Sequence, residues 1–156
     1  MTRQPQRRMS ATEMLSRLHR GFRAKLTPDQ RSQLELCHLV NLDAIATGAA
    51  EPAILWDWVG CVLTWMSVAE QLRVGELEMT LQIEVATRLV DRFGRTGQVR
   101  FDGPDYQAAR VGLQIMSQLA DIVDAPTAVL AVSWSERELD KIQISAMAFR
   151  PMAEAA

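Results

Sequence analysis

The sequence is poor in the residues that build most metal and redox sites. Its 156 residues include two histidines, His19 and His38, and two cysteines, Cys37 and Cys61. It has no CxxC pair and no cluster of cysteine with histidine, so the common zinc motifs are absent from it. We expect no metal ion, no other cofactor, and two buried cysteines with free thiols. Their even number leaves one disulfide open as the alternative.

The sequence also lacks the motifs that carry nucleophiles or hold phosphates. It contains neither GxxxxGK[ST] nor GxGxxG, and no serine lies in a GxSxG turn. A di-iron bundle needs an ExxH motif on each of two helices, and no such pair is present. We expect His38 to be a core or boundary residue of a helix. The sequence therefore predicts a protein without catalytic activity, and an enzyme would need His38 in a cleft near Asp43 or Asp57.

Long hydrophobic runs are scarce, and only one needs a membrane check. Residues 53–69 carry a single charge, Asp57, together with Trp56, Trp58 and Trp65. This run is at the lower limit for crossing a bilayer, and Asp57 would cost roughly 3 kcal/mol near its centre. We interpret it as the central helix of a bundle, with Trp58 and Trp65 in the core. No secretory signal is visible either, so we expect a cytoplasmic protein without membrane attachment.

Charge is small in sum but unevenly placed. The formal net charge is −2. Residues 1–25 contain seven basic side chains and one acid, and the rest of the chain is acidic. The basic N-terminal segment is thus the candidate site for a polyanion or a partner. Its candidate binding residues are Arg7, Arg8, Arg17, Arg20, Arg23 and Lys25.

The basic segment has the pattern of a short amphipathic helix. Ser10 and Glu13 have the spacing of a capping box. Apolar side chains then recur every four residues, at Met14, Leu18, Phe22 and Leu26, which predicts a helix over about residues 11–26. Its apolar face could dock on the acidic body, or the segment could bind nucleic acid, an acidic protein or a membrane surface.

The remainder of the chain reads as a helical bundle. Turn signals at Pro28, Pro52, Gly75, Pro104 and Pro126 divide it into five apolar-faced segments. We expect helices over about 28–46, 52–73, 76–93, 105–122 and 126–146, with residues 94–105 as a packed loop. The fold class is therefore an all-α, single-domain, up-and-down bundle of about five core helices plus the basic N-terminal helix. The expected parts are the basic arm at 1–26, the bundle at 27–148 and a frayed tail at 149–156.

Two finer expectations concern helix faces. In the helix over 76–93 we expect Gly94 to mark the end, and Glu84 to pair with Arg88 four residues later. In the helix over 105–122 we expect the buried stripe to be Val111, Ile115, Leu119 and Ile122, flanked by Leu113, Met116 and Ala120. Glu70, Glu76 and Glu78 gather at one turn, and a solvated acidic turn explains them better than a cation site.

Several short motifs resemble those of a group of helical proteins. They are Leu42-Asp43-Ala44-Ile45, Trp56-Asp57-Trp58, Phe93-Gly94-Arg95-Thr96-Gly97 and Gly103-Pro104-Asp105-Tyr106. They resemble small uncharacterised helical proteins of proteobacterial phages, plasmids and integrated elements. The resemblance covers roughly residues 27–145 and leaves out the arm. It implies a mobile-element context and no catalytic residues.

This context shapes the functional hypotheses by analogy. The leading one is a non-enzymatic binding protein that acts through a protein partner and inhibits a host defence complex, as anti-CRISPR proteins do. Its acidic body would then suit a basic surface on the target. The rivals are a nucleic-acid-binding accessory protein that uses the arm, and a helical subunit of a larger assembly. A homodimer is also compatible with the abundant apolar faces.

Overall fold

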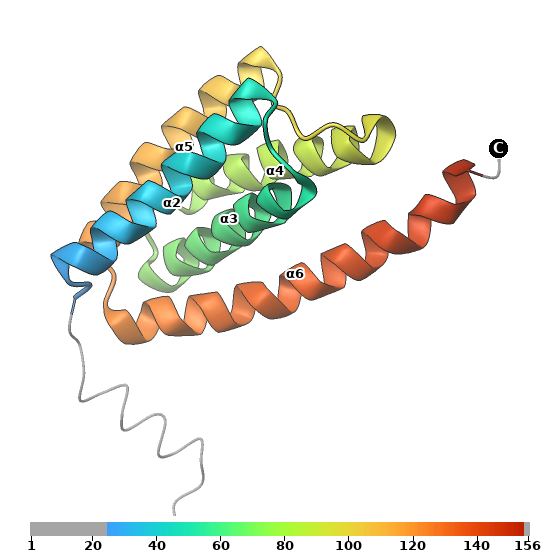
Figure 1. Cartoon of the computed structure of the whole chain (residues 1–156). Helices are drawn as coiled ribbons and strands as arrows, with labels where there is room; N and C mark the ends of the chain where they lie inside the picture. Colours follow the sequence, from blue (N-terminus) through green and yellow to red (C-terminus); the bar gives the residue numbers. More distant parts are fainter. Residues whose placement is uncertain (1–24, 155–156) are drawn as a thin grey trace, which may run out of the picture.

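The computed structural model describes the backbone of residues 25–154 and the side chains of residues 25–146. Within that range the chain forms five helices and no strand. They are α2 (Pro28–Thr47), α3 (Pro52–Leu72), α4 (Glu76–Thr96), α5 (Gly103–Ile122) and α6 (Ala125–Glu154), shown in Figure 1. The predicted all-α helical bundle is confirmed, whereas residues 11–24 of the predicted basic helix lie outside the described residues.

Local signals start α2 and α5, and stop α2, close to where the sequence predicts. The Thr27 hydroxyl accepts the amide of Gln30, whose side-chain oxygen accepts the Thr27 amide, and Pro28 occupies the first turn of α2. Gly48 ends α2 with a φ of 75°, a conformation that glycine adopts without strain. Asp102 caps α5 by accepting the Asp105 amide at 2.8 Å.

The helices form a four-membered ring with a fifth helix laid against it. Contacts join α2 to α3, α3 to α4, α4 to α5 and α5 back to α2. The fifth helix, α6, packs chiefly on the outer side of α3. Figure 1 shows α6 along the lower edge of the bundle, with α2 and α5 side by side on the other side of α3. Hollows flank α6 on both sides, one shared with α2 and α3 and the other with α3 and α4.

Among the described helices, α3 occupies the centre because it is the most apolar. It contacts all four others, and its buried residues include Trp58, with no exposed surface, and Trp65. By length and composition α3 alone among the described helices could also cross a membrane, and half of its apolar window is buried inside the protein. A central bundle helix meets the same criteria, so its composition fits the core position that we expected.

The connection between α4 and α5 is a packed loop, as predicted. Val99 and Phe101 both point into the core and keep only 5% and 6% exposure. The Phe101 ring meets Trp58 edge-on, with 5.8 Å between ring centroids. The loop therefore closes one end of the ring with aromatic packing.

Three expected helix ends were misplaced. Gly94 lies inside α4, which ends instead at Gly97 with a φ of 69°. α6 continues to Glu154, so the frayed tail expected from residue 149 is helical up to that point. Its good helix formers Ala146, Met147 and Ala148 favour this continuation. At the other end, Lys25 forms an antiparallel bridge with Asp124, so the expected helix over 11–26 does not include Lys25 and Leu26.

The buried face of α5 differs from the predicted stripe. Leu119 and the flanking Met116 and Ala120 are buried as predicted, and Asp105, Ala109 and Gly112 face inward with them, whereas Val111 and Ile122 of the predicted stripe keep 55% and 47% exposure. The prediction followed the largest apolar side chains. The rotation of α5 is set instead by a buried carboxylate and by small residues that let α4 approach. Arg88 also departs from expectation, because it pairs with Asp105 instead of Glu84.

Candidate functional site

A groove runs between α2 and α6, with α3 as its floor. It encloses about 550 Å³ and is lined mainly by apolar side chains of these three helices. We call it the α2–α6 groove; it is lined by Leu34, Leu36, Cys37, His38, Val40, Asn41, Asp57, Cys61, Thr64, Trp65, Val68, Ala128 and Val132. The groove exists because α2 and α6 both pack on α3 and make little contact with each other.

The walls of this groove leave large apolar side chains in solvent. On α2, Leu36 is 62% exposed and Val40 is 55% exposed, and on α6 Val132 is 44% exposed. Val129 and Leu130 extend the same exposed character along α6. A concentration of large apolar residues around a concave surface is typical of protein-interaction sites.

The attachment of α6 to α3 fixes the depth of the groove. The Thr64 and Ser135 hydroxyls lie 2.7 Å apart, and Thr64 also donates to the Gly60 carbonyl. A side chain at Gly60 would press against Leu139, so this glycine lets the two helices approach closely. α6 therefore sits on the Gly60 face of α3, with the α2–α6 groove along one side of it.

A smaller hollow extends the groove toward the first described residues. Its lining consists of Leu26, Gln30, Gln33, Leu34 and Cys37, and it encloses about 360 Å³. Leu34 and Cys37 line both spaces. The groove therefore opens at Leu26, beside the start of α2.

His38 lies on the side of α2 that packs on α3, where it is a structural contact. It is 8% exposed, and its Nε2 accepts the indole N–H of Trp65 at 3.3 Å. This hydrogen bond requires a neutral ring that carries its proton on Nδ1. Burial lowers the pKa of His38 to about 4, against a weaker opposing effect of the Glu35 carboxylate. The predicted core role of His38 is confirmed, and a base with so low a pKa is weak at neutral pH.

The two cysteines differ, contrary to the sequence expectation. Both thiols are free, as predicted, but Cys37 is exposed on the groove wall. Cys61 is half-buried at the floor of the groove; its thiol is turned toward the Met116 sulfur at 3.8 Å, and burial raises its pKa. Cys37 is exposed because α2 places it one position before the buried His38, on the side that faces the groove. Cys61 is therefore an unreactive packing residue, whereas Cys37 is accessible.

A second cavity lies on the other face of α2, against α5. It encloses about 240 Å³ and is lined by residues that include Glu35, His38, Trp65 and Ser117. The Ser117 hydroxyl donates to Glu35 at 2.7 Å, and Arg31 donates to the same carboxylate at 3.2 Å. The hydrogen bond from Ser117, and after it that from Arg31, lowers the pKa of Glu35. Glu35 is thus held as an anion that joins α2 to α5.

Glu35 and His38 have the ExxH spacing of one half of a di-iron site. Both are engaged by protein groups, Glu35 by Ser117 and Arg31 and His38 by Trp65. Among the described residues, no three of His, Cys, Asp and Glu come together in a way that could hold a metal ion. The spacing here serves helix packing.

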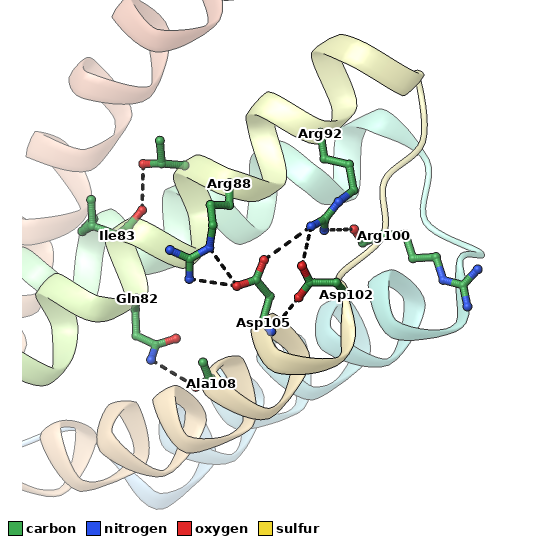
Figure 2. A network of polar contacts seen from close by, with 9 residues as sticks. Gln82, Ile83, Arg88, Arg92, Arg100, Asp102, Asp105 and Ala108 are labelled. Carbon is green, nitrogen blue, oxygen red and sulfur yellow. Dashed lines mark hydrogen bonds and ion pairs between the residues drawn. The ribbon is translucent and has the colours of Figure 1, made fainter.

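The densest polar cluster joins α4 to α5 and is shown in Figure 2. Arg88 donates from Nε at 2.9 Å to the Asp105 carboxylate, and its Nη2 lies 2.8 Å from the same oxygen. Arg92 binds the Asp102 carboxylate and the Arg100 carbonyl, each at 2.8 Å. The Asp105 amide that caps onto Asp102 is the main reason that the pKa of Asp102 is lowered.

This α4–α5 cluster holds the two helices in position, and its charged groups are engaged with each other instead of being available to a ligand. Asp105 is 3% exposed and both of its arginine partners come from α4. Nearby, the Gln82 side chain donates to the Ala108 carbonyl at 3.1 Å and presses against Gly112. A charged group held by such fixed partners is typical of structural ion pairs.

The predicted binding residues of the arm fall almost wholly outside the described chain. Arg7, Arg8, Arg17, Arg20 and Arg23 lie in residues 1–24. Lys25 is exposed and its backbone pairs with Asp124. Asp57 is exposed and lines the same groove as His38, whose Nε2 is occupied by Trp65. The acidic turn contains the exposed ion pair of Arg73 with Glu76 at 3.6 Å.

The groove itself was missed by sequence reasoning, although one signal was present. Apolar residues cover much of the circumference of α2: Leu36 and Val40 border the groove, whereas the exposed Leu39 borders the cavity against α5. A helix at the edge of a bundle needs only one apolar face. The apolar residues of α2 outside that one face were therefore the sequence signal that a second side of the helix borders a binding surface.

Comparison of the chain with protein-family models, with curated proteins and with solved structures finds no match. The resemblance to proteins of phages, plasmids and integrated elements therefore stays a prediction.

Proposed function

We propose that this chain is a non-enzymatic binding protein that takes up a basic amphipathic helix of a protein partner in the α2–α6 groove. The observation that carries the proposal is the set of exposed apolar side chains on both walls, with Leu36 and Val40 on α2 and Val132 on α6. Burying them against a partner would release their hydration water, which is the main favourable contribution to most protein association.

The shape of the groove favours a helical ligand. Its floor is one helix and its walls are two helices that run in the same general direction. An amphipathic helix inserts its anchors at i, i+4 and i+7 into such a space. The groove volume of about 550 Å³ suits several side chains of ordinary size.

The charge at one end of the groove favours a basic ligand. Asp57 lines that end, and Asp43 follows Val40 by three positions on the same side of α2. On α6 the four-residue spacing of Ala128 and Val132 continues to Glu136. These three acids are exposed, and none forms an ion pair among the described residues. Their field would steer a cationic partner and fix its direction.

The polar side chains beside the groove support a binding role over a catalytic one. The His38 Nε2 is occupied by Trp65, and burial raises the pKa of the Cys61 thiol. The exposed Cys37 shares the groove with His38 and Asp57, but no hydrogen bond joins it to either residue. A cysteine nucleophile needs a base within hydrogen-bond reach.

The biological setting is part of the proposal and rests on the resemblance. A protein of a mobile element in the cytoplasm that carries a helix-binding groove could inhibit a host defence complex by occupying one of its helices. The acidic body would then meet a basic surface of the target. Subunit function in a larger assembly would use the same groove with a permanent partner.

A matched pair of substitutions tests the groove. Val40 and Val111 are both 55% exposed, but Val40 borders the groove and Val111 lies on α5 outside it. We expect both V40D and V111D to change the free energy of unfolding by less than about 0.5 kcal/mol. Tagged wild type, V40D and V111D would be used for affinity purification with mass spectrometry from proteobacterial cells that encode defence complexes. The captured protein would then be titrated in purified form.

The expected result is one partner that binds wild type and V111D alike and loses at least about tenfold in affinity to V40D, equivalent to about 1.4 kcal/mol. Equal binding by all three proteins would overturn the groove as the docking surface. A wild-type dimer that V40D converts to a monomer would identify a second copy of the chain as the occupant and would also refute the proposal.

Nucleic-acid binding by the arm is the rival function, supported by the excess of basic residues in 1–25. Fluorescence anisotropy with a labelled DNA duplex at increasing salt distinguishes it. Phosphate contacts would give a log–log slope of about −0.9 per contact. Binding that the arginine-to-alanine variants of Arg17, Arg20 and Arg23 abolish would favour this rival.

A further inference from the structure

The first described residues enter the molecule at the mouth of the α2–α6 groove. Lys25 pairs with Asp124, the residue that immediately precedes α6, while α2 begins three residues later at Pro28. Leu26 packs against the hydrophobic core and lines the hollow that opens into the groove. Residues 1–24 are therefore attached between the N-terminal ends of the two helices that form the groove walls.

From this placement we propose that residues 11–24 dock in the α2–α6 groove of their own chain and act as its intramolecular ligand. The segment would run antiparallel to α2, joined to it by the short link at residues 25–27. Helices joined by so short a connection pack side by side in most bundles.

The apolar pattern of the segment fits this position. Leu26 is already seated at the mouth, and the same four-residue spacing leads back along the chain to Phe22, Leu18 and Met14. A helix over residues 11–24 is about 21 Å long. The wall of α2 from Gln30 to Asn41 is about 18 Å long by the same rise, so the apolar stripe spans the groove.

The charges also match when the segment runs in this direction. α3 runs antiparallel to α2, so Asp57, near the start of α3, lies toward the end of the groove that is remote from Leu26. An antiparallel segment brings Arg7 and Arg8, which precede it, to that end. Asp43 and Glu136 lie on the helix faces that border it, and they are exposed and without an ion pair among the described residues. The opposite direction would place these arginines near Lys25.

Docking of the segment in the groove does not depend on the proposed function. Its role in regulation does, because it requires a partner that competes for the same groove. The segment has the chemistry of the proposed partner, a basic amphipathic helix, so it would cover the apolar walls until a partner displaces it. A ligand that must displace an internal competitor binds more weakly by the fraction of molecules in which the groove is open.

Cys37 provides a probe in the isolated full-length protein. It lies on the groove wall and is exposed among the described residues, whereas Cys61 is packed against Met116. A docked segment would shield Cys37 from alkylation. Iodoacetamide labelling followed by peptide mass spectrometry measures the rate at each cysteine separately.

The variants are L18E, F22E and the matched control S16E. Leu18 and Phe22 belong to the apolar stripe, while Ser16 is two residues from Leu18 and lies on the opposite face of the predicted helix. All three add one negative charge to the same segment. We expect L18E and F22E to raise the alkylation rate of Cys37 by about tenfold over wild type and S16E. Cys61 should stay slow in every protein, which reports that the body is folded.

A peptide of residues 9–26 added to L18E supplies a second measurement. It should restore the protection of Cys37, and the same peptide with Leu18→Glu should not. Equal Cys37 rates in wild type, S16E and both stripe variants, or no effect of the peptide, would overturn the inference. Protection of wild type that disappears on dilution would assign the shielding to a second molecule and would also overturn it.

This experiment contains no partner, so its outcome is separate from that of the V40D and V111D comparison. Unprotected Cys37 together with loss of the partner in V40D would remove the intramolecular ligand and leave the proposed function intact. If Cys37 were protected but the V40D and V111D comparison revealed no partner, the intramolecular ligand would stand and the proposed function would be removed.

Discussion

The interface between α4 and α5 and the groove between α2 and α6 are built in opposite ways. Across the first, arginines of α4 bind carboxylates at the start of α5, and Gln82 packs directly onto Gly112. Across the second, apolar side chains face one another over open space, with Val40 on one wall and Val132 on the other. In the α4–α5 interface the charged side chains are paired with each other. In the α2–α6 groove no described residue covers the apolar side chains of the two walls.

This contrast is the reason that both proposals concern the groove. Buried charges are costly unless they are paired, so the α4–α5 contacts are self-sufficient and set the rotation of α5. Exposed apolar side chains contribute to the stability of a fold or complex only when another segment or a partner buries them. The groove is therefore the surface on which the two proposals converge.

The largest expected effect comes from removing the buried carboxylate of the closed interface. We expect D105A to lower the free energy of unfolding by about 2–4 kcal/mol, because Arg88 and Arg92 lose the charge to which they bind. Urea denaturation followed by circular dichroism measures this effect.

D91A is the matched control for D105A. Asp91 is exposed on α4 and forms no ion pair among the described residues, so its loss should change stability by less than about 0.5 kcal/mol. If the two variants were equally stable, the polar cluster would not hold α4 against α5.

The next effect concerns the polar contact beneath the groove and depends on pH. The pKa of His38 is about 4 in the folded protein, below the ordinary value of 6.5. Between these values the unfolded chain binds a proton that the folded chain does not, so stability falls as pH falls from about 6.5 toward 4. We expect a loss of about 2 kcal/mol between pH 7 and pH 5, a range in which ordinary carboxyl groups stay ionised.

Urea titrations at pH 7 and pH 5 of wild type and H38Q check this pH effect. Glutamine has no charge to gain, so H38Q should lose most of the pH dependence in this range. An unchanged dependence in H38Q would show that another group is responsible and that His38 is not buried as a neutral ring.

A smaller effect is expected from two glycines that differ only in their surroundings. At Gly112 a methyl group would collide with the buried Gln82 side chain and displace its hydrogen bond to Ala108. We expect G112A to cost about 1–2 kcal/mol. At Gly94, also inside a helix, no atom lies within 4 Å of the added carbon, so G94A should stabilise by up to about 1 kcal/mol.

Thermal and urea unfolding of both alanine variants gives the comparison. A loss in both would point to a general cost of alanine at these positions, and a gain in both would show that Gln82 moves aside freely. Opposite signs would confirm that α5 is held by direct contact at Gly112.

Sequence patterns were most informative where the physics is local. Thr27, Pro28 and Gln30 lie within one turn of each other, and their capping arrangement was predictable from spacing alone. The core position of Trp58 followed from the most apolar segment of the chain. The packed loop was expected within residues 94–105, and Val99 and Phe101 bury their side chains there.

The failures depended on contacts between distant segments. The rotation of α5 is set by Arg88 and Gln82 of α4, which no pattern within α5 reveals. The exposure of Cys37 and Val132 depends on how far apart α2 and α6 lie on α3. Periodicity identifies an apolar face but does not say whether another helix covers it.

The attachment of α6 to a single main neighbour has a consequence for the order in which the fold opens. α2 and α4 each pack on two other helices, α5 packs on three and α3 on four, whereas α6 packs chiefly on α3, through contacts such as that between Thr64 and Ser135. A unit with fewer buried contacts detaches at lower free energy than the rest. Amide protons of α6 should therefore exchange with solvent before those of α3, and each such excursion would widen the groove from one side while the ring stays closed.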